Sequence, residues 1–268
     1  MTVLFASDLD RTLIYSKNSR GLEVEETDLV AVEWINGIPV AYMTKKGITL
    51  FHQLSSKLTF LPVTTRTKHQ FERITGLFNA NEVPKYAIVS NGAVILENGI
   101  PMGEWSNKVE KRLQQDCTSI QDVTLQLDPY IRKGFIGDVK QAESWFVYLT
   151  IDEKTCSVED LEQLSQNLYQ QGYTLSRQGR KVYVMPNCIN KSAAVEFVQD
   201  QMEVDLVIAA GDSVLDYDMV MNADRGFFPL HGEVAQSKGA FPSRIEITQC
   251  SGVLAGEEIL KRIENLLL

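Results

Sequence analysis

Short apolar runs of β-favouring residues recur along this chain and alternate with helical patterns. Four of these runs have the character of buried strands: Val3 to Ala6, Thr59 to Val63, Tyr86 to Val89 and Asp205 to Ala210. Apolar residues at helical spacing occupy the intervals at 47–58 and 69–78. Strands that alternate with helices form a mainly parallel sheet with crossover helices, so the pattern predicts a doubly wound, Rossmann-like α/β fold.

The first of these runs leads directly into two carboxylates, Asp8 and Asp10. Open α/β sheets bind their ligands at the edge where parallel strands end, which is where this pair lies. Like charges at such short range cost free energy unless a cation or a proton neutralises them. A lone Asp-x-Asp is more typical of a solvated turn, so the interpretation depends on what else ends at the same edge.

Three further segments bring polar residues to that edge. Thr64 follows the second strand, Lys191 opens a helix that extends to about residue 202, and Asp212 follows the fourth strand with Asp216 beyond it. Because the carboxyl ends of parallel strands share one edge of a sheet, these groups are predicted to converge. Carboxylates, a lysine and a hydroxyl together suit the joint binding of Mg²⁺ and a phosphoryl group.

A hairpin is predicted shortly after the first strand. Asn36-Gly37 lies between two β-rich runs at 29–34 and 38–43, and Asn-Gly is the typical two-residue turn of a hairpin. The hairpin, near 29–43, either covers the carboxylate pair as a flap or adds two strands at a sheet edge. Both interpretations stay open from sequence.

The pattern changes in the segment 94–187. It predicts helices at 105–116 and 157–171 and strands at 144–151, 173–176 and 181–185. This order indicates a small α+β unit with a largely antiparallel sheet, inserted into the α/β fold. Alternating strands and helices resume afterwards, so 1–93 and 188–268 are predicted to form one catalytic core with 94–187 as an inserted cap domain.

The composition of the chain limits which binding partners and which cellular compartment are expected. The chain has 268 residues and a formal net charge of −9, which disfavours nucleic acid or an anionic membrane as partner. Its four cysteines are scattered without a C-x-x-C pair, as expected of reduced thiols in the cytoplasm. No apolar run approaches the roughly 20 residues of a membrane span, and no basic region opens a secretory signal. A cytoplasmic protein with a small phosphorylated substrate is expected, and no protein partner is inferable.

Taken together, the polar segments resemble the four motifs of the haloacid dehalogenase (HAD) superfamily of phosphohydrolases. Asp8-Leu9-Asp10-Arg11-Thr12 is similar to its D-x-D-x-T motif, Thr64 and Lys191 to the second and third motifs, and Gly211-Asp212-Ser213-Val214-Leu215-Asp216 to G-D-S-x-x-D. The insertion resembles the large cap of the branch that includes sucrose-phosphate and mannosylglycerate-phosphate phosphatases and Cof-type enzymes. Asn91-Gly92-Ala93 also fits that branch.

The resemblance implies a phosphatase that forms an aspartyl-phosphate. Asp8 would be the nucleophile, and Asp10 would protonate the leaving oxygen and then deprotonate water. Thr64 and Lys191 would bind the phosphoryl oxygens. The Mg²⁺ cofactor would be held by the residues implied as metal ligands, with Ser213 in support: Asp8, Asp10 through its backbone carbonyl, Asp212 and Asp216.

Some positions are left open by the resemblance. Arg11 stands where glycine is usual; its side chain either points to solvent or contacts the substrate, and the first is the expectation. Leu215 stands where many members have asparagine. Arg66, Asn91 and Asn187 are possible substrate contacts. Sequence does not separate a phosphatase from a phosphomutase on the same scaffold, and a non-hydrolytic phosphoacceptor protein is the third hypothesis.

Overall fold

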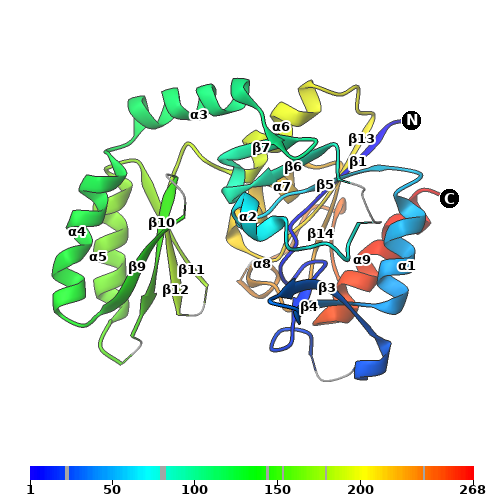
Figure 1. Ribbon diagram of the computed structural model, residues 1–268, viewed down its shortest axis with the longest axis horizontal. Coiled ribbons are helices and arrows are strands. Elements are labelled where there is room, and N and C mark those ends of the chain that lie inside the picture. Colours follow the sequence, from blue (N-terminus) through cyan, green and yellow to red (C-terminus); the bar gives the residue numbers. More distant parts are fainter. Residues whose placement is uncertain (22–23, 79–82, 143–144, 153, 179, 238) are drawn as a thin grey trace. The chain divides into compact units, whose positions relative to one another are not determined.

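The computed structural model describes residues 1–21, 24–78, 83–142, 145–152, 154–178, 180–237 and 239–268 (Figure 1). Its chain forms two compact units. The core unit consists of Met1–Pro101 and Lys191–Leu268, and the inserted unit of Met102–Asn190. The residues 94–101, assigned to the insertion from sequence, lie in the core unit because β7 (Val94–Glu97) pairs with β6 (Tyr86–Val89) along its whole length. The residues 188–190, assigned to the core from sequence, lie in the inserted unit.

A five-stranded parallel sheet forms the centre of the core unit, in the order β15-β14-β13-β1-β5. Its strands are β1 (Val3–Ser7), β5 (Thr59–Pro62), β13 (Leu206–Ala210), β14 (Arg225–Phe228) and β15 (Ile245–Ile247). Ser7 lies opposite Ala210 on one side and Pro62 on the other, so β1, β13 and β5 end at the same level. The predicted doubly wound α/β fold is confirmed.

Helices cover both faces of this sheet. The main ones are α1 (Lys45–Leu54), α6 (Lys191–Asp200), α7 (Tyr217–Asn222) and α9 (Val253–Leu266). From β1, the chain reaches β5 through α1, whereas from β13 it reaches β14 in the opposite direction through α7. Right-handed crossovers therefore place α1 and α7 on opposite faces. Figure 1 shows α1 beside α9 on one side and α6 beside α7 on the other.

The predicted hairpin is present. β3 (Leu29–Ile35) and β4 (Ile38–Thr44) pair around Asn36 and Gly37, whose φ angles of 51° and 77° are those of a type I′ turn. β2 (Tyr15–Ser16) extends it to a sheet of order β2-β4-β3.

The helix predicted at 69–78 is wrong in its extent, because α2 covers only Lys68–Phe71. Gly76 donates its N–H to Val32 O, and a Cβ there would lie 2.8 Å from the hairpin backbone. Close packing on β3 therefore replaces the helix.

The remaining elements of the core unit are short. They are β8 (Ile100–Pro101), α8 (Glu233–Ser237) and the 3₁₀ turns η1 (Glu26–Asp28), η2 (Ser90–Gly92) and η3 (Val214–Asp216). β6 lies beside the end of β5 and runs parallel to it. Thr64, just after β5, donates its N–H to Ile88 O, and Val63 forms a parallel bridge with Ile88. The loops after β1, β5, β6 and β13 therefore begin next to one another, at the same edge of the core unit.

The inserted unit is built on an antiparallel sheet of order β11-β12-β10-β9. Its elements are α3 (Gly103–Asp116), α4 (Ile120–Arg132), β9 (Ile136–Ala142), β10 (Phe146–Ile151), α5 (Val158–Tyr169), β11 (Tyr173–Gln178) and β12 (Lys181–Pro186). The predicted strand at 144–151 begins at Phe146, and residue 144 lies outside the described residues. α4 and β9 were not predicted. Apolar side chains of α4, α5 and the sheet form the core of this unit.

Candidate active site

The site begins where β1 ends. Asp8 donates its N–H to Ala210 O of β13 at 2.9 Å, which continues the pairing of the two strands and leaves the Asp8 side chain at the sheet edge. The side chain is buried, and Thr12 Oγ1 donates to Asp8 Oδ2 at 3.2 Å. One carboxylate oxygen is thereby oriented by the residue four positions later.

Lys191 lies between two carboxylates. It is the first residue of α6, and its buried Nζ is 2.6 Å from Asp8 Oδ1 and 2.5 Å from Asp216 Oδ1. Burial acts to lower the pKa of the Lys191 ammonium, but the charges of Asp216 and Asp8 outweigh it and raise that pKa above its usual value. The ammonium therefore stays charged within the cluster.

Asp216 organises the loop after β13. Its Oδ2 accepts hydrogen bonds from Asp212 N at 3.2 Å, Ser213 N at 2.9 Å and Ser213 Oγ at 2.8 Å. Gly211 permits this closure, because a Cβ there would lie 2.2 Å from Asp216 Cβ. The loop thus closes through Asp216 and Ser213, with no contribution from the Leu215 side chain to these bonds.

Asp8, Asp212 and Asp216 form a buried acidic cluster, in which one carboxylate oxygen of each lies within 4.8 Å of the others. Burial raises the pKa of Asp8 well above its usual value, despite the opposing charge of Lys191. Burial, and then the charge of Asp216, raise the pKa of Asp212 to about 7. A cation would favour the charged forms of these acids, and carboxylate oxygens are the ligands of hard divalent metals, so the donor set fits a divalent cation.

Asp10 lies outside this acidic cluster and pairs with Arg66. Arg66 Nε donates to Asp10 Oδ2 at 2.6 Å and Arg66 Nη2 to Asp10 Oδ1 at 2.7 Å, a bidentate pair. The same guanidinium contacts Glu33 of the hairpin. Asp10 is about half exposed, in contrast to the buried Asp8.

Thr64 and Asn91 lie in the neighbouring strand-end loops. Thr64 is buried, and its Oγ1 accepts from Arg66 N at 3.1 Å. Asn91 donates its N–H to Thr64 O at 2.9 Å, and it adopts a left-handed φ of 59°. Asn187 belongs to the inserted unit, where its backbone N–H binds Gly172 O. The substrate contacts of Arg66, Asn91 and Asn187 stay predictions.

Arg11 does not simply point to solvent. Its Nε donates to Asp212 Oδ2 at 2.9 Å, although the side chain is half exposed. Its backbone has a φ of 63°, the left-handed region in which glycine is at ease. The expectation of a solvated side chain was wrong because this backbone turn directs the guanidinium toward the loop after β13.

Sequence reasoning missed three residues that shape the site. Thr12 orients Asp8 and was visible as the last position of the D-x-D-x-T motif. Glu33 had a weaker signal, a lone carboxylate inside a β-type run. His231 holds the backbone of Arg11, with its Nε2 2.9 Å from Arg11 O, and no sequence pattern marked it.

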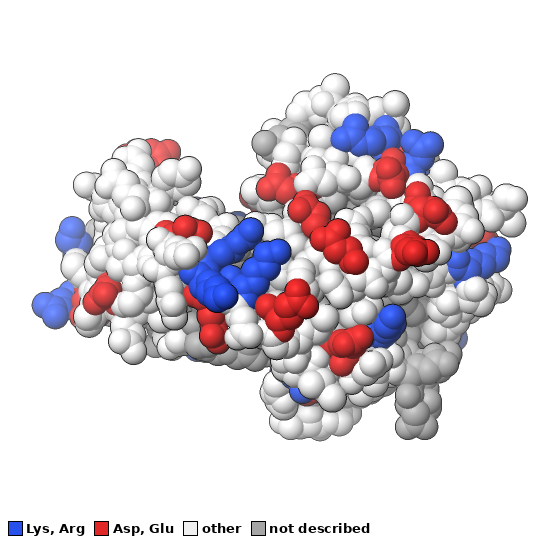
Figure 2. Space-filling model, turned by 90° about the horizontal axis from the view of Figure 1, so that it is seen from above, with Lys and Arg blue, Asp and Glu red and all other residues white. Residues whose placement is uncertain are grey.

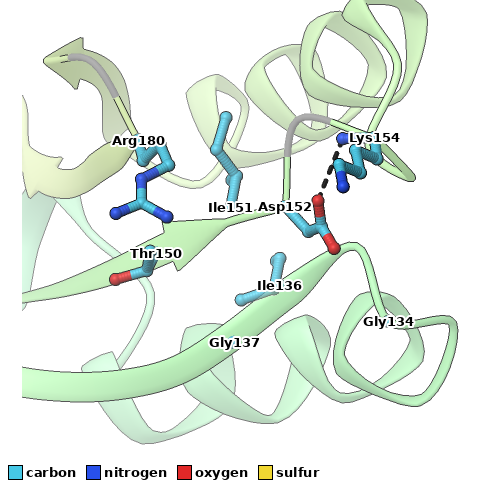
Figure 3. Close-up of a pocket in the computed structure, with 8 residues that line it drawn as sticks. All are labelled: Gly134, Ile136, Gly137, Thr150, Ile151, Asp152, Lys154 and Arg180. Carbon is cyan, nitrogen blue, oxygen red and sulfur yellow. Dashed lines mark hydrogen bonds between the residues drawn. The ribbon is translucent and has the colours of Figure 1, made fainter.

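The structure has further features on its surface. In the inserted unit, an open pocket of about 570 Å³ is lined by Thr150, Asp152, Lys154 and Arg180 among others (Figure 3). Figure 2 shows a group of Lys and Arg side chains on one face with acidic side chains around them, so the net charge of −9 is not spread evenly. None of the helices that the structure describes has the length and apolar character of a membrane span.

Comparison with known proteins identifies the class. A family model described as sucrose-6F-phosphate phosphohydrolase matches residues 1–228. The structure of sucrose-phosphatase from Synechocystis sp. PCC6803, solved with sucrose and phosphate, is similar with a TM-score of 0.70 at 17% identity over 99% of this chain and 98% of that one. A phosphatase of the HAD superfamily from Bacteroides thetaiotaomicron has a TM-score of 0.58 at 14% identity over 100% and 96%. A sequence search of curated proteins finds no match.

The fold and the motif residues at its sheet edge define a phosphoric monoester hydrolase of the HAD type. Within that class, the match over residues 1–228 of the 268 places the chain in the sucrose-6F-phosphate phosphohydrolase family. The suspected HAD branch is thereby confirmed.

Proposed function

We propose that this protein is a Mg²⁺-dependent phosphatase that hydrolyses a phosphorylated sugar through an aspartyl-phosphate on Asp8. The observation that carries the proposal is the buried cluster in which Lys191 Nζ lies 2.6 Å from Asp8 and 2.5 Å from Asp216. The family to which the chain belongs makes sucrose 6F-phosphate the first substrate to test.

In the first step, Asp8 Oδ attacks phosphorus in line with the leaving oxygen. A P–O bond forms to Asp8, the P–O bond to the sugar breaks, and Asp10 gives its proton to the departing sugar oxygen. Lys191 lowers the repulsion between the Asp8 carboxylate and the anionic phosphate, because its ammonium is fixed beside Asp8 and stays charged. The Thr64 hydroxyl would bind a phosphoryl oxygen.

In the second step, water attacks the phosphorus of the aspartyl-phosphate. Asp10, now a carboxylate, takes a proton from this water, the P–O bond to Asp8 breaks, and phosphate leaves. Asp8 returns as a carboxylate and Asp10 as an acid, so protons and charge balance over the cycle. The half exposure of Asp10 suits exchange with both a leaving group and water.

Mg²⁺ would be held by the Asp8 and Asp212 carboxylates and the Asp10 backbone carbonyl, with Asp216 and Ser213 shaping the loop around it. When bound, it supplies positive charge that offsets both the phosphate and the carboxylates. The orientation of Asp216 toward the loop N–H groups and Lys191 supports a structural role for this residue rather than direct ligation.

The test is replacement of the nucleophile. Asp8→Asn should lower phosphate release from sucrose 6F-phosphate and related sugar phosphates by at least about 1,000-fold, because removing a nucleophile forfeits the covalent route. Asp218→Asn, which changes an exposed acid at the start of α7, serves as control and should turn over like the wild type. Retained activity in Asp8→Asn, or isomer formation by the wild type without phosphate release, contradicts the proposal.

A further inference from the structure

Glu33 is a buried carboxylate in an unusual position on the hairpin. Its side chain is only 3% exposed, and the neighbouring Val32 is buried as well. Successive side chains of a regular strand point to opposite faces, so regular pairing would place Val32 and Glu33 on opposite faces of the hairpin. The pairing of β3 with β4 is irregular on both sides of Glu33, between Ala31 and Glu33 and between Glu33 and Trp34. Such irregularities re-aim a side chain.

The re-aimed carboxylate contacts Arg66. Arg66 Nη1 lies 2.8 Å from Glu33 Oε1, and Arg66 Nη2 donates to Glu33 Oε2 at 2.9 Å. The other edge of this guanidinium makes the bidentate pair with Asp10, at 2.6 and 2.7 Å. One planar guanidinium therefore lies between a carboxylate of the hairpin and the carboxylate that the proposed mechanism uses as acid and base.

Arg66 is also held through its backbone. Its N–H donates to Thr64 Oγ1 at 3.1 Å, and its carbonyl accepts from Ser90 N at 2.7 Å. Its side chain is 13% exposed, whereas that of Asp10 is 47% exposed. A half-exposed carboxylate has several rotamers of similar energy unless a partner selects one. Arg66 is the partner that selects one here, and Glu33 restricts where the guanidinium of Arg66 can lie.

We propose that Glu33 is a positioning residue for the reaction: it holds Arg66, and Arg66 orients the Asp10 carboxyl group, which carries the proton in the first step, for transfer of that proton to the leaving oxygen. The inference rests on the proposed function, since it needs Asp10 to act as the acid. Proton transfer requires the donor within hydrogen-bond reach of the leaving oxygen, so a misplaced carboxylate loses rate even when it is still present.

Leaving-group dependence provides the test. A sugar alkoxide needs a proton as it departs, whereas nitrophenolate is stable enough to depart without one. The quantity to measure is kcat/KM, which covers the steps up to departure of the leaving group, for sucrose 6F-phosphate (or the best sugar phosphate) and for p-nitrophenyl phosphate. Glu33→Gln should lower kcat/KM by about 10- to 100-fold on the sugar phosphate, because a misplaced acid loses part of the rate enhancement that general acid catalysis supplies. On the aryl phosphate the loss should be less than about threefold.

Three variants complete the experiment. Arg66→Met should show the same selective loss, and the double variant Glu33→Gln, Arg66→Met should be no slower than Arg66→Met alone, because Glu33 acts through Arg66. Arg73→Met is the matched control. Arg73 Nη2 also pairs with Glu33, at 3.0 Å, but it takes no part in the Asp10–Arg66 pair, so kcat/KM should stay unchanged for both substrates. Circular dichroism and thermal unfolding establish that each variant folds.

The outcomes separate cleanly. An equal loss on both substrates, or no loss on the sugar phosphate, overturns the positioning role of Glu33 while the proposed function stands. If Glu33→Gln does not fold, Arg66→Lys replaces it in the experiment. This variant leaves Glu33 intact but removes the two-pronged guanidinium, and its kcat/KM values on the two substrates are compared in the same way. A wild-type protein that hydrolyses neither substrate overturns the proposed function, and the inference with it.

Discussion

At the scale of single residues, Arg11 is one of the two positions where this chain departs from the HAD pattern, and the structure shows what accommodates the change. A left-handed φ of 63° costs a residue with a side chain on the order of 1 kcal/mol. His231 offsets this by fixing the Arg11 carbonyl. Its Nδ1 accepts from Gly252 N at 3.1 Å, so its Nε2 carries the proton and donates to Arg11 O. Burial lowers the pKa of His231, which favours this neutral form.

Arg11 should also weaken metal binding, because its guanidinium occupies Asp212 Oδ2. We predict that Arg11→Gly and Arg11→Ala both raise the Mg²⁺ affinity of the protein severalfold, measured by calorimetric titration. Glycine removes the strain and loses an ion pair, so its stability should stay within about 1 kcal/mol of the wild type. Alanine keeps the strain and should unfold at a lower temperature. Unchanged Mg²⁺ affinity in both variants would contradict the competition for Asp212.

The site shows which residues sequence can and cannot locate. Asp8, Lys191 and Asp212 were predicted to converge because each follows a parallel strand or opens a helix, and topology then dictates where it lies. Glu33 follows no such rule. Its place depends on an irregular strand pairing and on the packing of the hairpin over the loop after β5, both of which are tertiary effects.

At the scale of elements, the strands of the core were predictable because buried parallel strands are continuous apolar runs. The helix predicted at 69–78 failed where Gly76 packs on the hairpin backbone, a contact that local propensity does not encode. α4 was missed although Val123 and Leu127 are spaced four apart, because Pro129 near its end interrupts the helical pattern. Tertiary packing thus decided the elements that local pattern did not.

An element-scale prediction concerns α9 and the loop before it. Glu258 of α9 accepts from Gln249 N and Cys250 N and pairs with Arg262. Partial burial acts to raise the pKa of Glu258, but these donors outweigh it and lower that pKa below its usual value of 4.5. A carboxyl group whose pKa is lower in the folded state than in the unfolded state stabilises the fold at pH values above its unfolded-state pKa. This contribution is lost as the pH falls through the folded-state pKa.

Glu258→Gln should therefore reduce the free energy of unfolding at neutral pH by about 1 kcal/mol or less, given the solvent exposure of the group. The difference from the wild type should vanish in acid, below both pKa values. Urea titrations across pH measure it, with Glu264→Gln of the same helix as control. A difference that persists unchanged in strong acid would show that packing, and not the charge, is responsible.

At the scale of the whole molecule, the chain divides into two units with separate cores, and all the residues of the buried acidic cluster belong to one of them. The inserted unit has its own apolar core between its helices and its antiparallel sheet. Domains with separate cores tend to unfold as separate units. A metal ion that binds Asp8 and Asp212 only in the folded core unit must then stabilise that unit and leave the inserted unit unaffected.

We therefore predict two transitions in differential scanning calorimetry, of which Mg²⁺ shifts only one. At about 100 times its dissociation constant, Mg²⁺ should stabilise the core unit by about 2.7 kcal/mol, which for a unit of this size raises its midpoint by several degrees. EDTA should reverse the shift. Asp212→Asn should abolish it, since the variant lacks a proposed ligand, while the transition of 102–190 stays where it was. An equal upward shift of both transitions would mean that the cation acts elsewhere, because no ligand of the proposed site comes from the inserted unit.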